Sequence, residues 1–154
     1  MNTTRPASSY LKPANESLGF LLGDTTRLIR RVCAVYLEEH QLTLAQMRAL
    51  MYVARSEGIR QVELADLLEV QPITLARLID QLAETGLVER RADPKDRRAF
   101  QLFLTEAATP IIAVLAERSA EFQQQALAGL TPEQIEILFF SLNKVRDNMS
   151  AMLR

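Results

Sequence analysis

The stretch VELADLLEVQPITLARLIDQLAETGLVERRADPKDRRAFQLFLT, residues 62–105, decides the fold of this chain. Its beginning predicts a short helix over 62–68, with leucine and alanine side chains available for burial. A second helix is predicted from Pro72 to about Thr85, because proline suits the first helical position, where its missing N–H needs no partner. Gly86 predicts the end of that helix, since glycine adopts a left-handed backbone without strain. Two helices joined by a short turn form a helix-turn-helix.

The second helix is predicted to have one apolar face and one polar face. At about 100° per residue its apolar side chains form a single stripe. The members of this stripe are Leu75, Leu78, Ile79 and Leu82. Thr74, Arg77 and Gln81 form a separate polar strip. The second helix of a helix-turn-helix can enter a DNA major groove with its first residues at the base edges. The pattern therefore predicts DNA binding, although helix-turn-helices without a DNA role exist.

Two strands are predicted after this helix, over 87–91 and 99–104, with the sequence ADPKDRR (92–98) between them. This run predicts a turn that offers Lys95, Arg97 and Arg98 at its tip. A hairpin directly after a recognition helix is a wing, whose arginines can reach the minor groove or the flanking phosphates. The alternative is an ordinary solvated polar turn. The order helix, turn, helix, hairpin favours the wing.

The run GLVERRADPKDRRAFQLFLTEAA, residues 86–108, resembles the signature of the MarR/SlyA family of winged-helix transcriptional regulators. The marks of this signature are the GLVER entry to the wing, the DP-x-DRR tip, and an alternating strand that ends in Leu-Thr-Glu. The preceding run, ELADLLEVQPITLARLIDQLAETG, is also similar to that family. The likeness extends from about Leu18 to the C-terminus. The fold that it implies is mainly α with a small β-wing, a winged helix-turn-helix flanked by dimerisation helices.

The resemblance implies a homodimer that binds double-stranded DNA at a pseudo-palindromic operator. It further implies a repressor that a small aromatic or anionic effector releases from DNA. In the matched wing motif Asp96 steadies Arg98, which enters the minor groove. The polar strip, the wing tip and the match together give the candidate DNA-binding residues. These are Gln71, Pro72, Thr74, Arg77, Gln81, Lys95, Asp96, Arg97 and Arg98.

The effector pocket of this family lies where the long dimer helices meet the winged helix. The corresponding candidates here combine aromatic, basic and flexible side chains, which could accept an aromatic acid. They are Arg30, Cys33, Tyr36, His40, Met47 and Met51, each equally explicable as core or surface. Some relatives sense peroxide through a cysteine near the start of the first helix, where this chain has Gly19. Cys33 is therefore interpreted first as a small buried apolar residue, with a redox-responsive regulator as an alternative.

The chain is predicted to comprise four segments. They are a flexible N-terminal arm (1–15), a dimerisation helix (16–42), the DNA-binding winged helix (43–104) and C-terminal dimerisation helices (105–154). The last segment is expected to start with Thr105 as a helix cap and to bend at Pro110. The outer helices carry more apolar surface than one small domain can cover, which indicates packing between subunits. The alternative is a helical hairpin within one chain.

Polar side chains predict where the other helices begin. Thr43 and Gln46 have the spacing of a capping box and predict a helix over 44–55. Thr131 and Gln134 have the same spacing and predict the start of the last helix. Arg60 stands where the family has a Ser or Thr cap. Either the glutamine after it caps the helix, or Arg60 is free to meet a phosphate.

Composition limits the possible functions. The 154 residues have a net charge of −1, but residues 86–98 hold five basic and three acidic side chains, a local patch suited to DNA. With one cysteine and one histidine, no metal cluster or Cys–His nucleophile pair can form within a subunit. We therefore expect no cofactor, no metal and no enzyme activity. With no apolar run long enough for a membrane span, we expect a cytoplasmic protein. A winged-helix module that contacts protein without specific DNA binding remains an alternative.

Overall fold

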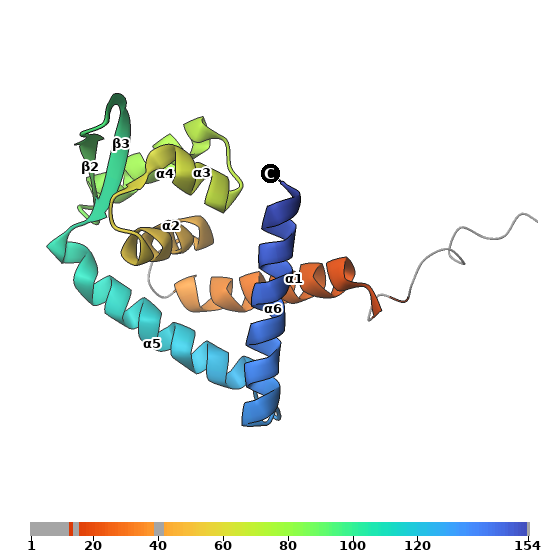
Figure 1. Ribbon diagram of the computed structural model, residues 1–154. Coiled ribbons are helices and arrows are strands. Elements are labelled where there is room, and N and C mark those ends of the chain that lie inside the picture. The colour runs from red at the N-terminus through yellow and green to blue at the C-terminus, as the bar shows by residue number, and fades with distance from the viewer. Residues whose placement is uncertain (1–12, 14–15, 39–41, 154) are drawn as a thin grey trace, which may run out of the picture. The chain divides into compact units, whose positions relative to one another are not determined.

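The computed structural model describes Pro13, residues 16–38 and residues 42–153. It is mainly α with one small sheet, which confirms the predicted fold class (Figure 1). The chain divides into two compact units, Met1–Thr109 and Pro110–Arg154. Apart from Pro13, the predicted N-terminal arm lies outside the described residues. The predicted four-segment division therefore stays a prediction.

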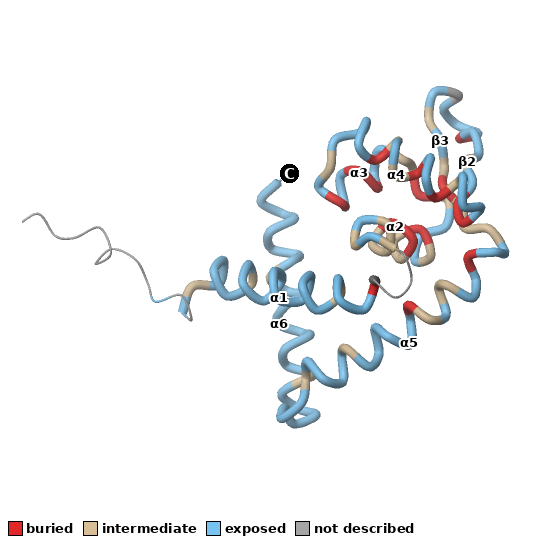
Figure 2. Tube along the Cα trace, turned by 180° about the vertical axis from the view of Figure 1, so that it is seen from behind, coloured by how far each residue is buried: buried red, intermediate tan, exposed pale blue. Residues whose placement is uncertain are grey.

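The core of the first unit lies among α2 (Leu44–Arg55), α3 (Gln61–Leu68), α4 (Pro72–Glu84) and the sheet. Figure 2 shows the buried positions concentrated in these elements. The largest fully buried side chains are Leu50, Val53, Leu64, Leu75, Ile79, Leu82 and Leu102. Each such burial stabilises the fold by about 1.5–3 kcal/mol relative to exposure. Three of the four residues of the predicted α4 stripe belong to this set, and Leu78 is half-buried.

The boundaries of the helix-turn-helix lie within one residue of the predicted ones. The turn between α3 and α4 depends on Glu69, which has a left-handed backbone (φ +57°) that the sequence did not reveal. The N–H of Val70 then donates to the carbonyl of Ala65 at 3.0 Å and closes the end of α3. Pro72 is the first residue of α4, and Gly86 follows its end with φ +73°, so both predictions are confirmed. The end of α3 and both ends of α4 are therefore set by the backbone conformations of Glu69, Pro72 and Gly86.

The sheet has three antiparallel strands in the order β1 (Ile59–Arg60), β3 (Asp96–Leu104), β2 (Val88–Asp93). The short strand β1 was not predicted. The prediction that 92–98 form a turn was wrong, because the hairpin ladder continues to Asp93 and Asp96 and leaves Pro94 and Lys95 as the turn. The reason is a side-chain contact: Asp93 accepts a hydrogen bond from the N–H of Lys95 at 2.8 Å and tightens the turn.

The ladder of the hairpin contains a bulge. Asp93 pairs with Asp96, whereas the adjacent Ala92 pairs with Phe100. Residues 97–99 therefore have no partner in β2 and leave the regular ladder. Bulges of this kind redirect side chains, and this one holds two of the predicted DNA-binding arginines.

Helix α2 begins with the predicted capping box. The N–H of Gln46 donates to the Thr43 hydroxyl at 3.2 Å, and the N–H of Thr43 donates to the Gln46 side chain at 2.8 Å. At the end of the first unit, the predicted cap at Thr105 is only partly correct. Its hydroxyl donates to the carbonyl of Gly86 instead, and a 3-10 helix (η3, Glu106–Ala108) follows it.

The second unit consists of most of α5 (Thr109–Ala126) and all of α6 (Pro132–Met152). Pro110 is the second residue of α5, so it lies in the first turn of that helix and not in the second turn as predicted. The expected bend stays a prediction. The capping box of Thr131 and Gln134 starts α6, as predicted. No residue of α6 is buried in the described part of the chain (Figure 2).

Helix α1 (Leu18–Glu38) leaves most of its apolar side chains exposed. Among the described side chains of α1 only Leu37, near the end of the helix, is buried. Helix α1 contacts α2 within the same unit. The large exposed side chains of α1 are Leu18, Phe20, Leu21, Leu28, Ile29, Val32, Val35 and Tyr36.

Candidate nucleic-acid interface

The outer face of α4 presents the predicted recognition residues. Gln71 occupies the N-cap position without a side-chain capping bond, and Thr74 and Arg77 follow on the first turns of α4; all three are exposed. Within the described residues the side chains of Thr74 and Arg77 make no hydrogen bond or ion pair, so both are available to a ligand. Gln81 is exposed but accepts a hydrogen bond from Gln46 of α2 at 3.4 Å. The side chains at the start of α4 are thus more available to a ligand than those near its end.

One exposed residue on this helix was missed. Ile73, the second residue of α4, is 65% exposed between Pro72 and Thr74. Its apolar side chain lies next to the polar strip of the helix and is open to a ligand. In a major groove it can contact the methyl group of thymine. Periodicity does not find this residue, because Ile73 lies outside the apolar stripe that faces the core.

The wing residues are held by contacts to the backbone. Lys95 lies in the exposed turn, and the Asp96 carboxylate accepts a hydrogen bond from the backbone N–H of Arg98 at 3.0 Å. Asp96 therefore steadies the bulge that carries Arg98, and the contact is to the main chain. The Arg98 guanidinium has no hydrogen bond or ion pair among the described residues. The side chain of Arg97 lies outside the described part.

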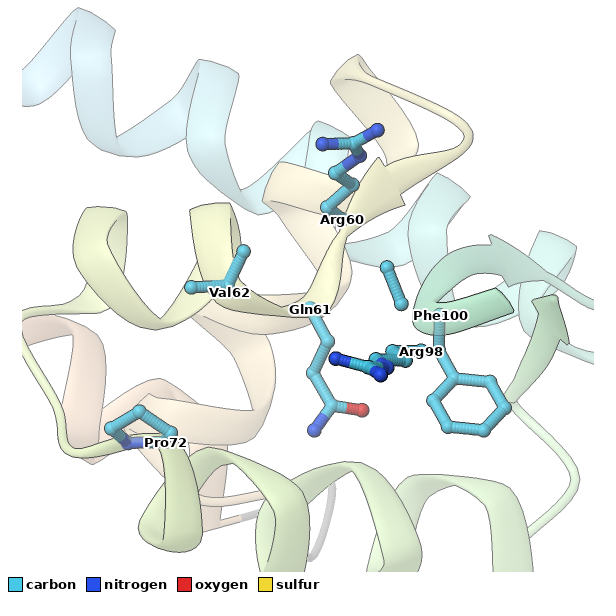
Figure 3. Close-up of a pocket in the computed structure, with 7 residues that line it drawn as sticks. Arg60, Gln61, Val62, Pro72, Arg98 and Phe100 are labelled. Atoms are coloured by element: carbon cyan, nitrogen blue, oxygen red, sulfur yellow. The ribbon is translucent and has the colours of Figure 1, made fainter. Parts of the chain in front are cut away.

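A hollow of about 260 Å³ separates the bulge from the starts of α3 and α4. Figure 3 shows the side chains of Arg98 and Phe100 on the β3 side, Gln61 at the start of α3 and Pro72 at the start of α4. The remaining lining residues are Arg60, Val62 and Ala99. The surface between recognition helix and wing is therefore concave and carries arginine side chains from two strands.

Arg60 follows neither of the two predicted alternatives. It occupies the cap position of α3 itself, where its backbone N–H donates to Glu63 at 3.2 Å. Its guanidinium Nε donates to Asp93 at 2.7 Å, so Arg60 is paired and not free. Asp93 is only 2% exposed, and the N–H of Lys95, followed by Arg60, holds the pKa of its carboxyl below the ordinary value. No local pattern in the sequence indicates this pair, because its members lie 33 positions apart.

Two other basic residues of the predicted patch are engaged within the protein. Arg90 donates to Gln61 of α3, to Asp80 of α4 and to the carbonyl of Ala76, at 3.0, 2.7 and 3.1 Å. Arg91 pairs with Glu89, and its guanidinium lies 4.1 Å from the centroid of the Phe103 ring. The basic surface available to DNA is consequently smaller than the residue count suggests.

The proposed effector residues lie on two helices that contact each other. Arg30, Cys33 and Tyr36 belong to α1, and Met47 and Met51 belong to α2. His40 lies outside the described residues. A hollow along α1 is lined by Arg30 but by none of the other candidates, so a common pocket remains a prediction. Burial raises the pKa of the Cys33 thiol, which leaves less of the reactive thiolate at neutral pH.

The described residues contain no group of three or more His, Cys, Asp or Glu side chains that could hold a metal ion. None of their helices is both long and apolar enough to cross a membrane.

Comparisons with known proteins agree with this geometry. A sequence model described as the MarR family matches residues 40–99. The structure is similar to a crystal structure of MarR, with a TM-score of 0.80 and 26% identity over 92% of this chain and 97% of the other. It is also similar to the transcriptional regulator SlyA, with a TM-score of 0.73 and 28% identity over 84% of this chain and 92% of the other. The S. aureus MepR–DNA complex has the same fold, with a TM-score of 0.70 and 21% identity over 86% and 96% of the two chains.

Proposed function

Because the chain belongs to the MarR family, whose members are transcription regulators and not enzymes, we propose that it is a homodimeric repressor that binds a pseudo-palindromic operator. The observation that carries this proposal is the pairing of an exposed recognition helix with an arginine-bearing wing. Thr74 and Arg77 would contact base edges. Gln71 would either contact a base edge as well or position the start of the helix on the DNA. Arg98 would enter the adjacent minor groove, where the narrow backbone spacing attracts arginine. MepR, which shares the fold, has been captured on DNA.

The homodimer is supported by unpartnered apolar surface on the outer helices. The exposed side chains of α1 described above are matched by a second group on α6. That group comprises Ile137, Leu138, Phe139, Phe140, Leu142, Met149 and Met152. Surface of this extent is uncommon on a monomer and typical of a subunit interface. Two-fold symmetry would place two recognition helices about 34–36 Å apart, in successive major grooves.

Release by a small aromatic or anionic effector is the second part of the proposal. An effector bound between α1 and α2 would favour a dimer whose recognition helices no longer match the groove spacing. Its affinity would then be higher for the free protein than for the DNA complex, because coupling is reciprocal. A redox switch through Cys33 is the less favoured alternative, since the raised thiol pKa opposes it. A winged-helix module that binds only protein is the other alternative.

The test is fluorescence anisotropy on duplexes from the upstream region of the protein's own gene and on shuffled duplexes. We expect a preference of about 10³-fold or more for the native duplex, with two chains bound per site. Arg98→Ala should weaken operator binding by about 1–3 kcal/mol without loss of helical signal. Arg55→Ala is the control, because it removes the same charge from the exposed end of α2, outside the proposed recognition helix, wing and dimer helices.

The outcomes separate the alternatives. Equal binding of native and shuffled duplexes after competitor DNA is added would favour the protein-interaction module. Operator affinity that Arg98→Ala leaves unchanged would refute the assignment of the wing. A single chain per operator would refute the homodimer.

A further inference from the structure

Arg90 joins three elements of the winged helix through one side chain. It is the third residue of β2, directly after the recognition helix and its turn. Its guanidinium donates to Gln61 Oε1 at the start of α3 and to Asp80 Oδ1 on α4. It also donates to the main-chain carbonyl of Ala76 on α4. The side chain is 25% exposed, so these bonds form at the edge of the core.

The contacts of Arg90 define the placement of α4 against the hairpin. Ala76 and Asp80 lie one helical turn apart, so the two bonds from Arg90 follow one line along the helix. A rotation of α4 about its axis, or a shift along it, would break both. The guanidinium is planar and presents its donors in a fixed fork, which makes it suited to hold such a geometry.

We propose that Arg90 is a positioning residue for DNA recognition, which fixes α4 relative to the wing. This inference rests on the proposed function. A recognition helix in the major groove and a wing in the minor groove must be held at one spacing to fit the same duplex. In this arrangement Arg90 touches neither groove. It fixes the position of Arg77 on α4 relative to Arg98 on β3. Small misplacements of recognition groups weaken the fit to one sequence more than the attraction to DNA in general.

Replacement of Asp80 tests this role, because the charge effect and the loss of the bond to Arg90 change operator affinity in opposite directions. Its side chain is 57% exposed, so Asp80→Ala should leave folding nearly unchanged. Removal of a carboxylate near DNA should, by charge alone, strengthen binding to every duplex. Loss of the bond to Arg90 should instead weaken binding to the operator. Glu84→Ala is the matched control, because Glu84 is an exposed carboxylate one turn further along α4.

The experiment compares operator and shuffled duplexes by anisotropy for the native chain, Asp80→Ala, Glu84→Ala and Arg90→Lys, with helical signal checked for each. We expect Asp80→Ala to lower the ratio of specific to non-specific affinity by about tenfold. Arg90→Lys should lower it too, since lysine keeps the charge but lacks the fork. Glu84→Ala should leave the ratio unchanged.

A ratio that is the same for Asp80→Ala and Glu84→Ala would overturn the inference and leave Arg90 with a role in stability alone. The proposed function would survive that result, because the native chain would still discriminate. No discrimination by the native chain would refute the proposed function, and the inference with it.

Discussion

Replacement of Gly58 by alanine tests how the wing is anchored to the rest of the winged helix. Gly58 has a left-handed backbone (φ +82°) directly before β1, and its N–H donates to the carbonyl of Leu102 on β3 at 2.9 Å. A Cβ at this position would lie 3.2 Å from Cζ of Phe103. Gly86 has a similar backbone conformation (φ +73°), but a Cβ added there would have no neighbour within 4 Å, so Gly86→Ala is the matched control.

The two substitutions share one cost and differ in another. A left-handed backbone costs alanine about 1–2 kcal/mol, and the smaller entropy of the unfolded variant returns about 0.4–1 kcal/mol. Gly86→Ala should therefore destabilise the fold by about 0–1.6 kcal/mol, or about 0.8 kcal/mol at the midpoints of both ranges. Crowding of a packed side chain adds about 1–3 kcal/mol at Gly58. The crowding cost at Gly58 should be in the lower part of this range, because the Phe103 ring is only half-buried and can move away from the added methyl group.

The measurement is urea unfolding followed by far-ultraviolet circular dichroism, since the chain has no tryptophan. Chain concentration is held fixed, because association stabilises the folded state by mass action. We expect Gly58→Ala to be less stable than Gly86→Ala by about 1 kcal/mol or more. Equal destabilisation of the two variants would refute the contact of Gly58 with the Phe103 ring as a constraint on the wing.

Two further predictions concern titratable groups. The N–H of Lys95 and the Arg60 side chain lower the pKa of Asp93 in the folded state. The ionised carboxylate therefore stabilises the folded state at pH values above the ordinary pKa of 3.8, and this stabilisation is lost as pH falls through the folded pKa. The difference in urea midpoint between the native chain and Asp93→Asn should therefore be constant near neutral pH and shrink in acid; a constant difference down to about pH 2 would contradict this. Burial raises the pKa of Cys33, so peroxide should leave operator binding of the native chain equal to that of Cys33→Ser. Loss of binding in the native chain alone would establish the redox alternative.

The features that the sequence predicted correctly are those with a local cause. Pro72 and Gly86 act on their own backbone, and a capping box joins residues three positions apart, as at Thr43 and Gln46. The apolar stripe of α4 follows from helical periodicity. Each of these signals is complete within one turn or one short segment, so the sequence order alone reveals it.

The features that were missed depend on partners distant in sequence. Strand β1 has two residues and exists only because β3 pairs with it more than forty positions later. The polar run 92–98 has the composition of a turn, yet Asp93 is buried because Arg60 from another element pairs with its carboxylate. A carboxylate that is stabilised in the core cannot be distinguished from a solvated one by composition.

The same distinction applies to the candidate DNA interface. The candidate residues on α4 could be predicted from the sequence because a polar strip at helical spacing is a local pattern. Arg90 has the same residue type and lies in the same basic run as Arg98, but its donors are directed to Gln61, Asp80 and Ala76 within the protein. A count of basic residues therefore combines two kinds of arginine. One kind has no hydrogen bond or ion pair among the described residues and is proposed to contact DNA. The other is bonded within the protein and is proposed to hold the recognition helix in place.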